Sequence, residues 1–400
     1  MSWKNIKLGE VAETTSGGTP NRSIALYWDG NIPWLKSGEL NDSVVEKTEE
    51  FITEEGLKNS SAKLFKKGTL LLALYGATAG KLGILNFEST TNQALCAITP
   101  KNGNIDNKFL LYFLLFKREQ IIKDSIGGAQ PNISQSYVRN LSIPLPALTT
   151  QQKIAAILDH ADALRKKDQQ LLVKYDELLR SVFNFMFGDP VKNEKRWEVK
   201  KLKEISSKIL SGNTPKGGSQ VYVDNGIVFF RSQNVWKNEL IYDDIAFIDE
   251  GTHSKMKNSS LKHKDILMTK TGRINTENSS LGRAALFLGE DNSANVNGHV
   301  YLIRLKQGSI HEFILTILTS VEYRDHIRKV CVGGIDKRQL NKEHIEDFPI
   351  IYPPITLQDQ FASIAKNIQR QREITRMQMD HSENLFQSLL QKAFKGELIK

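Results

Sequence analysis

One segment of the sequence has the residue types of a phosphate-binding loop. Residues 75–82 read YGATAGKL, and glycine-rich loops that end in Gly-Lys can cradle the phosphates of a nucleotide. The spacing fails, because Tyr75 stands where the first glycine of the motif belongs and Leu82 replaces the hydroxyl that would hold Mg²⁺. We therefore predict a turn here, with Gly76 in a backbone role, and no nucleotide site.

Other catalytic signatures are also incomplete. Amino-methylating enzymes carry Asp or Asn followed by two prolines and an aromatic residue, of which residues 187–190 (FGDP) and 352–355 (YPPI) hold only fragments. No Pro-Asp dipeptide begins a common nuclease motif, and the eight histidines form no metal-ligand spacing. His160 and His381 are expected on helix surfaces. The sequence thus predicts no catalytic, cofactor-binding or metal-binding residues of its own.

The sequence does contain a long internal repeat. Residues 16–20 (SGGTP) return as residues 211–215 (SGNTP), and the flanking WKNIKLGE and IPWLKS return as WEVKKLKE and IVFFRS. Further equivalent pairs are Gly127-Gly128 with Gly333-Gly334, Pro146 with Pro353, Gln151 with Gln358, and Phe187 with Phe394. A period of about 200 residues is too long for a solenoid repeat, so each copy is predicted to be a domain with a connector.

Composition and charge limit the class of protein. A chain of 400 residues is long enough for two to three domains. No apolar run reaches membrane-spanning length, and residues 1–10 (MSWKNIKLGE) lack an apolar stretch, so neither a membrane span nor a signal peptide is expected. Cys96 and Cys331 occupy non-equivalent places, so neither a metal site nor a disulfide is predicted, and a cytoplasmic location is expected. The net charge of +9 favours a polyanionic partner.

Each copy divides into a globule and a long helix. Residues 1–149 and 188–356 are rich in short apolar runs broken by Gly, Asn and Pro, which predicts strand-rich globules with a few helices such as 109–123 and 313–330. Residues 150–187 and 357–394 lack Gly and Pro, and each begins with a capping pattern. At 1.5 Å per residue each helix would be roughly 57 Å long. The two are expected to pack antiparallel and hold the globules apart.

A seven-residue apolar repeat in these helices predicts a coiled coil. Only Asp168 is polar in the two rows of the first helix, whereas the middle of the second helix is polar. The predicted core comprises Ile154, Ile157, Ala161, Leu164, Leu171, Tyr175, Leu178 and Val182 of the first helix, and Phe361, Ile364, Ile368, Leu385 and Leu389 of the second. A further role of exposed members as a subunit interface is expected.

The duplicated motifs resemble those of the specificity (S) subunit of Type I restriction–modification enzymes. The resemblance covers essentially the whole chain and lies in the tryptophan segments, SGGTP and SGNTP, residues 127–133 (GGAQPNI), 141–144 (LSIP), 187–190 (FGDP) and 389–398 (LLQKAFKGEL). Residues 333–337 (GGIDK) depart from the family pattern, which leaves local contacts in the second copy open.

The resemblance implies an α+β fold and a non-catalytic role. Two target-recognition domains (1–149 and 188–356), in pseudo-two-fold arrangement, would each read half of a bipartite, asymmetric double-stranded DNA target, separated by two antiparallel helices (150–187 and 357–400 with the tail). Two modification subunits with S-adenosylmethionine would methylate adenine N6. Restriction subunits with ATP and Mg²⁺ would complete a nucleoid-associated complex, and no cofactor would bind this chain.

The residue types in the repeated loops suggest which positions contact DNA. Lys, Arg and backbone amides bind phosphates, and Arg, Lys, Asn and Gln read base edges. The candidates are Lys36, Ser37, Lys81, Asn92, Gln93, Gln130 and Asn132 in the first copy, and Arg231, Gln233, Asn234, Lys270, Arg273, Asn297, Lys337 and Arg338 in the second. The SGGTP turns and Gly272 are expected to be structural.

Two alternatives from other classes stay open at this stage. A methyltransferase that combines recognition and chemistry in one chain would bind S-adenosylmethionine by itself. A free-standing DNA-binding regulator with two readers would lack neighbouring genes for modification and restriction subunits.

Overall fold

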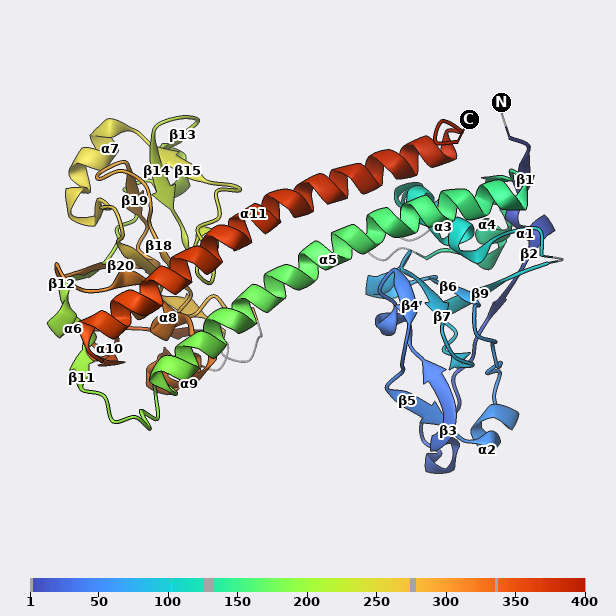
Figure 1. Ribbon diagram of the computed structural model, residues 1–400, viewed down its shortest axis with the longest axis horizontal. Helices are drawn as coiled ribbons and strands as arrows, with labels where there is room; N and C mark the ends of the chain where they lie inside the picture. The colour runs from blue at the N-terminus through green and yellow to red at the C-terminus, as the bar shows by residue number, and fades with distance from the viewer. Residues whose placement is uncertain (1–2, 102, 126–131, 274–277, 335–336, 400) are drawn as a thin grey trace. The chain divides into compact units, whose positions relative to one another are not determined.

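The computed structural model describes residues 3–101, 103–125, 132–273, 278–334 and 337–399 (Figure 1). The chain forms two compact units. Unit 1 comprises Met1–Gln169 and Met377–Lys400, and unit 2 comprises Gln170–Arg376. Two long helices, α5 (Leu148–Phe187) and α11 (Ile355–Phe394), each contribute to both units. We call residues 1–147 globule 1 and residues 188–354 globule 2.

Globule 1 is built on two sheets. The five-stranded sheet has the order β2 (Ala12–Ser16), β9 (Leu95–Pro100), β6 (Leu70–Ala73), β7 (Leu82–Leu85), β4 (Ser43–Val45). The three-stranded sheet has the order β5 (Glu50–Ile52), β3 (Trp28–Leu35), β8 (Thr90–Thr91). Strands β6 and β7 are buried along their whole length, since both of their faces are covered.

The other elements of globule 1 are short apart from one helix. Strand β1 (Asn5–Lys7) pairs with β10 (Ser142–Pro144). The helices are α1 (Leu8–Val11), α2 (Glu54–Lys58), α3 (Asn107–Lys123) and α4 (Gln135–Asn140), with 3₁₀ turns η1 (Ala25–Tyr27), η2 (Ser37–Glu39) and η3 (Gly76–Thr78). Helix α3 confirms the helix predicted at 109–123. The Asp106 side chain caps it by accepting a hydrogen bond from the Phe109 amide.

Globule 2 repeats this plan. One sheet has the order β12 (Ser206–Ser211), β20 (Val300–Leu305), β16 (Ile266–Thr269), β18 (Ala284–Leu286), and a second has the order β13 (Tyr222–Val223), β15 (Ala246–Ile248), β14 (Ile227–Phe230), β19 (Ala294–Val296). Smaller sheets join β17 (Thr271–Gly272), β22 (Arg338–Gln339) and β21 (Val332–Gly333), and β11 (Val199–Lys201) with β23 (Pro349–Ile351). The parallel pair β14–β19 corresponds to β3–β8 of globule 1.

The helices of globule 2 differ from the prediction at one point. They are α6 (Leu202–Ile205), α7 (Glu250–Lys255), α8 (His311–Thr319), α9 (Val321–Val330) and α10 (Lys342–Glu346), with η4 (Gly218–Val221), η5 (Ser232–Asn234) and η6 (Lys257–Ser259). The single helix predicted at 313–330 is two helices. Ser320 ends α8 in an extended conformation and caps α9, because its hydroxyl accepts a hydrogen bond from the Tyr323 amide (3.2 Å).

The long helices run antiparallel within each unit. In unit 1, Ser382 Oγ donates to Asp168 Oδ2 (2.8 Å), and Ile154 shares a hydrophobic core with Ala393. In unit 2, Arg372 forms an ion pair with Asp176 (3.1 Å). The α+β class with two long antiparallel helices is therefore confirmed. Each helix begins two residues earlier than predicted.

The end of each helix completes the core of the other copy's globule. Phe394 of α11 lies against Phe109 and Phe113 of globule 1, with ring centroids 5.2 and 5.5 Å apart. Phe187 of α5 lies against Phe313 of globule 2, at 4.9 Å. Globule 1 is therefore closed by the helix at the far end of the chain, and globule 2 by the helix that directly precedes it. Closing these cores is the physical role of the repeated phenylalanine.

The start of each long helix is fixed by a buried glutamine. Gln151 and Gln358 are fully buried, and their Nε2 atoms donate to the carbonyl oxygens of Pro146 (2.9 Å) and Pro353 (2.8 Å). The Pro and Gln positions recur together in the sequence because they form this hydrogen bond.

Part of the predicted coiled-coil core is wrong. Ile154, Ala161, Phe361 and Ile368 are buried, and Leu171, Tyr175, Val182 and Leu389 are half-buried. Ile157, Leu164, Leu178, Ile364 and Leu385, however, are exposed. A helix that packs on both a partner helix and a globule buries a wider stripe than a coiled-coil seam, and the stripe drifts by about 20° per heptad. Leu158 and Phe386 fill that stripe in unit 1.

Among the described residues, we find no helix that combines the length and the apolar character needed to cross a membrane.

Candidate nucleic-acid interface

The strand ends of globule 1 meet in one group of loops. The Asn92 amide donates to the Leu35 carbonyl (2.9 Å), the Leu74 amide to Ala94 (2.8 Å), and the Ile133 amide to Leu74 (2.7 Å). We call this group loop cluster 1; it consists of residues 16–19, 35–37, 74–81, 91–94 and 132–133. It brings together all the described DNA-contact candidates of the first copy.

The same three hydrogen bonds recur in globule 2. The Asn297 amide donates to the Phe230 carbonyl (3.0 Å), the Lys270 amide to His299 (2.8 Å), and the Leu340 amide to Lys270 (2.9 Å). Loop cluster 2 consists of residues 211–214, 230–234, 270–273, 297–300 and 337–340. The two copies thus present their candidate residues on the same backbone frame.

The repeated pentapeptide holds this frame together. A Cβ atom on Gly17 would lie 2.1 Å from the Thr91 carbonyl oxygen, and one on Gly212 would lie 2.2 Å from the Val296 carbonyl oxygen. Real Cβ atoms do not approach backbone oxygen this closely, so only glycine fits. The structural role expected for SGGTP and SGNTP is confirmed. The first glycine of each lies against the last residue of a strand, Thr91 of β8 or Val296 of β19, where there is no room for a side chain.

Replacing either glycine by alanine is expected to destabilise its globule. The added methyl group forces the backbone apart, which we expect to cost at least about 2 kcal/mol and to lower the melting temperature by roughly 4–8 °C. Gly38→Ala is the matched control, since a Cβ at Gly38 of turn η2, next to loop cluster 1, would meet no atom within 4 Å. Thermal unfolding of Gly17→Ala, Gly212→Ala and Gly38→Ala checks this. Equal melting temperatures for all three would contradict it.

A lysine of loop cluster 1 is held by acidic side chains. Lys36 Nζ lies 2.9 Å from Glu50 and 3.3 Å from Glu49, and hydrogen bonds to Glu50 and Glu49 raise the pKa of Lys36. Burial raises the pKa of Glu50, but hydrogen bonds from Arg22 and Lys36 outweigh burial and lower it. Lys36 therefore stays protonated, and a phosphate would have to compete with two carboxylates for it.

The equivalent position of loop cluster 2 has the same property. Arg231 forms an ion pair with Asp244 (3.0 Å), and Gln233 Nε2 donates to the same carboxylate (3.2 Å). Asn234 is fully buried, and its Nδ2 donates to the Ile241 carbonyl (3.1 Å). The prediction that Asn234 contacts DNA is wrong for this fold, because its side chain closes turn η5 instead.

The remaining candidates differ in exposure. Lys81, Gln93, Asn132, Gln233, Arg273 and Lys337 are exposed, whereas Ser37, Asn92, Lys270, Asn297 and Arg338 are half-buried. Asn297 Oδ1 accepts from the His299 amide (3.0 Å), and Arg338 Nη1 donates to the Cys331 carbonyl (3.2 Å). Gln130 lies outside the described residues. The exposed cations have the chemistry to bind phosphates, and the exposed amides have the chemistry to read base edges. Their contacts with DNA stay predictions.

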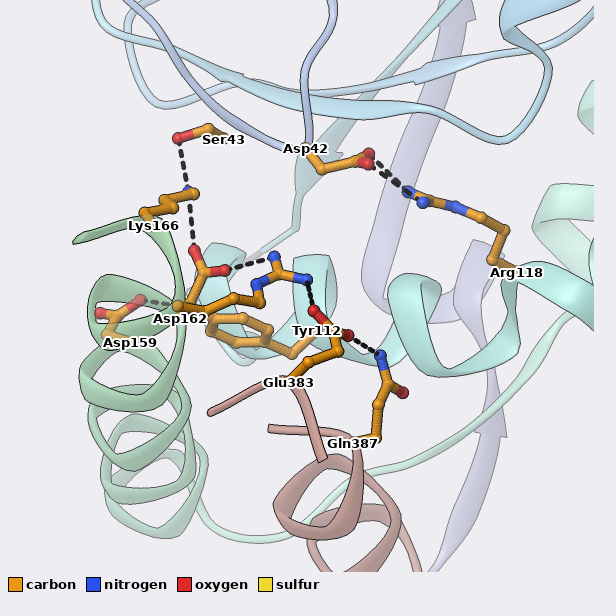
Figure 2. Close-up of polar contacts among 10 residues, drawn as sticks. Asp42, Ser43, Tyr112, Arg118, Asp159, Asp162, Lys166, Glu383 and Gln387 are labelled. Atoms are coloured by element: carbon orange, nitrogen blue, oxygen red, sulfur yellow. Dashed lines mark hydrogen bonds and ion pairs between the residues drawn. The ribbon is translucent and has the colours of Figure 1, made fainter. Parts of the chain in front are cut away.

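A polar network where globule 1 meets the long helices was missed by sequence reasoning (Figure 2). Asp162 of α5 accepts from Arg165 (2.6 Å) and Lys166 (2.6 Å). Arg165 also pairs with Glu383 of α11 (3.1 Å), which accepts from Gln387 (2.9 Å). Burial lowers the pKa of Arg165, but its bonds to Glu383 and Asp162 outweigh burial and raise it.

The network continues into helix α3. Asp159 accepts from Tyr112 (2.7 Å) and Lys108 (2.6 Å), while burial, followed by this hydrogen bond, raises the pKa of Tyr112. In unit 2 the equivalent pair has exchanged its charges, with Lys366 on the long helix and Glu312 on α8 (3.4 Å). No single-residue motif marks such a pair. The alignment of the two copies is the signal that could have found it. It places Lys108 and Asp159 at the positions of Glu312 and Lys366, so that each copy has one positive and one negative side chain there.

Comparison with known proteins adds the family context. The Type I restriction modification DNA specificity domain matches residues 1–173 and 194–380. The chain is 28% identical to the Type I restriction enzyme MjaIX specificity subunit of Methanocaldococcus jannaschii, over 99% of this chain and 93% of that protein. It is 21% identical to the EcoKI specificity subunit of Escherichia coli, over 99% of this chain and 89% of that protein.

Solved structures share the fold. The S subunit of a Type I restriction–modification system from M. genitalium matches with a TM-score of 0.60 at 15% identity, over 98% of this chain and 96% of that chain. A chain from a study of complex assembly in the Type I system matches with a TM-score of 0.55 at 18% identity, over 99% and 98% of the two chains.

Proposed function

The chain belongs to the Type I restriction modification DNA specificity family, and from that premise we propose that it is the non-catalytic DNA-recognition subunit of such a system, in which each globule reads one half of a bipartite, asymmetric target. The observation that supports this proposal is the recurrence of one backbone frame with different side chains. Where loop cluster 1 has Lys36 and Leu74, loop cluster 2 has Arg231 and Lys270. Because base readout depends on side-chain chemistry, such a pair of readers would select different sequences.

Sequencing of modified bases in the host genome tests this proposal. Expression of the chain with its neighbouring modification gene is expected to methylate one motif made of two unlike half-sites separated by a non-specific spacer. Deletion of the chain alone is expected to abolish that methylation. A continuous motif, or methylation that persists without the chain, would contradict the proposal. Methylation by the purified chain alone would instead support a single-chain methyltransferase.

The partners proposed are two modification subunits, which would carry S-adenosylmethionine, and restriction subunits, which would carry ATP and Mg²⁺. The exposed apolar residues of α5 support a docking role for that helix. Leu164 is 46% exposed in unit 1, and Phe185 is 84% exposed in unit 2. Large apolar side chains in such positions, on helices otherwise rich in charge, are typical of interaction sites. The complex would act in the cytoplasm, at the nucleoid.

Placing a charge on this surface is expected to block assembly without unfolding the chain. We expect Leu164→Asp and Phe185→Asp to reduce co-purification of the modification subunit at least about 10-fold, because a carboxylate buried in an interface is not solvated. The melting temperature should stay unchanged, since exposed positions contribute little to stability. Gln170→Asp, at an exposed position of the same helix, is the matched control. Full co-purification of both leucine and phenylalanine variants would place the docking surface elsewhere.

A further inference from the structure

One contact between globule 1 and helix α5 depends on a residue with unusual backbone geometry. Asp42 has a φ of 61°, and its carboxylate accepts two hydrogen bonds from Arg118 (3.0 and 2.5 Å) and one from the Leu82 amide (2.9 Å). The next residue, Ser43, accepts a hydrogen bond from Lys166 Nζ of α5 (2.9 Å) (Figure 2). We call Asp42, Ser43, Arg118 and Lys166 link 1.

Globule 2 has a contact at the equivalent place. Asn238 has a φ of 58°, and its Oδ1 accepts from Thr319 Oγ1 of α8 (3.0 Å). The next residue, Glu239, binds Arg376 of α11 through both carboxylate oxygens, with one bond of 2.7 Å. We call Asn238, Glu239, Thr319 and Arg376 link 2.

The two links have equivalent backbone hydrogen bonds but contact the long helix through different side chains. The Asp42 amide donates to the Leu82 carbonyl (2.8 Å) and the Asn238 amide to the Ala284 carbonyl (2.9 Å), which are equivalent bonds. Asp and Asn tolerate the left-handed conformation better than most residues. The helix contact, however, is Lys to Ser in one unit and Arg to Glu in the other. The two copies therefore keep the contact with the long helix while changing the residues that make it.

The links are too exposed to be explained by stability alone. The Arg376 and Glu239 side chains are each 33% exposed, and Lys166 is 34% exposed. An ion pair of this exposure, such as Arg376 with Glu239, contributes about 0–1 kcal/mol because water screens it, and the hydrogen bond from Lys166 to the neutral Ser43 hydroxyl is solvated in the same way. Both links instead connect three parts of one unit: a segment of the reading globule (the start of β4 in unit 1, the loop at 238–239 in unit 2), a helix of the same globule (α3 or α8) and a long helix. Such a contact restrains rotation of the globule on its helix more than it adds stability.

We propose that link 1 and link 2 are positioning contacts that fix the angle of each globule on its own long-helix segment, and thereby the spacer length at which the two half-sites are read. This inference rests on the proposed function. Arg118 of link 1 also donates to the Gly80 carbonyl of loop cluster 1 (2.9 Å), whereas the long-helix cations Lys166 and Arg376 bind Ser43, Asp162 and Glu239, which lie outside the loop clusters. Loss of Lys166 or Arg376 should therefore relax spacing without changing the bases that are recognised.

The test uses the full chain in complex with its modification subunit. Duplexes would carry the native half-sites with the native spacer or with one base pair more or fewer, and initial methylation rates would be measured. We expect Lys166→Met and Arg376→Met each to lower the preference for the native spacer about 3- to 10-fold, with the half-site preference and melting temperature unchanged. Lys166→Arg and Arg376→Lys should restore most of the preference.

Matched controls separate this role from others. Lys167→Met and Arg370→Met change exposed cations on the same two helices and should leave the preference intact. The inference is overturned if the two link variants keep the unmodified spacer preference, or if they lose activity equally on all spacers together with a lower melting temperature. Failure of the unmodified complex to methylate any bipartite target would overturn the proposed function instead.

Discussion

Exchanging globule 1 for that of a relative is expected to change one half of the methylated motif and leave the other half intact. Loop cluster 1 lies wholly within unit 1 and loop cluster 2 within unit 2. Each globule also has separate hydrophobic cores. Because specific DNA binding exceeds non-specific binding by about 10³-fold or more, we expect the original half-site to lose recognition by a comparable factor.

The structure defines how this exchange should be made. The junction belongs at Leu148, where α5 begins. The incoming globule should keep aromatic residues at the positions of Phe109, Phe113 and Phe116, since all three lie against Phe394 of α11. A globule without these aromatic residues would leave a cavity around Phe394 and lower the stability of the fold by about 3–5 kcal/mol. A loss of methylation could then come from misfolding instead of from altered specificity.

Sequencing of modified bases reads the result directly. The reciprocal exchange of residues 188–354 is the matched control and should change the other half-site only. New bases in both half-sites after a single exchange would show that the two globules do not read independently.

The repeat explains why so much of the fold was predictable from one sequence. Two copies of the same segment order act as an alignment of two sequences. Comparison of the two copies picks out the glycine of SGGTP, the Pro–Gln pair at each helix start, and Phe187 with Phe394 as residues that the fold requires. Each of these residues has a local or buried role that only one residue type can fill, so both copies retain it.

The errors have a different physical origin. A seven-residue pattern identifies a long amphipathic helix, but it does not say whether the helix packs on one neighbour or two. The pattern therefore predicts Leu164 and Leu178 in the core, whereas both are exposed. The residue type of Asn234 predicts a contact with a base, because an amide can read base edges. The same amide can also stabilise a turn, and here it accepts from the Arg231 amide and donates to the Ile241 carbonyl.

The links could not be predicted because their chemistry changes between the copies. Lys166 with Ser43 and Arg376 with Glu239 share neither residue type nor exact helix position. Only the left-handed Asp42 and Asn238 align, and backbone conformation at a non-glycine residue is not visible in a sequence.

Lengthening both long helices by seven residues is expected to shift recognition to a longer spacer. Seven residues preserve the apolar register and add roughly 10.5 Å of helix, which corresponds to about three base pairs of duplex. Helix tilt reduces this, so we expect methylation of targets whose spacer is longer by two or three pairs. Methylation at the native spacer should fall at least about 100-fold, since three pairs rotate the duplex by roughly a third of a turn.

Both helices must be lengthened together, because ion pairs fix their register on either side. Arg165 pairs with Glu383 in unit 1, and Arg372 with Asp176 in unit 2. Matched insertions after Gln170 and after Met377 leave both pairs intact. An insertion in α5 alone must break one of them or bend the helix, so this control should lose methylation at every spacer.

An insertion of four residues in each helix distinguishes length from disruption. It adds roughly 6 Å, between one and two base pairs, and introduces a stutter that locally unwinds the packing. The exposed polar side chains in the middle of α11, such as Gln371 and Gln378, leave room for that adjustment. We expect weaker methylation at a spacer one pair longer. If both insertions methylate the native spacer at the unmodified rate, the long helices do not set the distance between the half-sites.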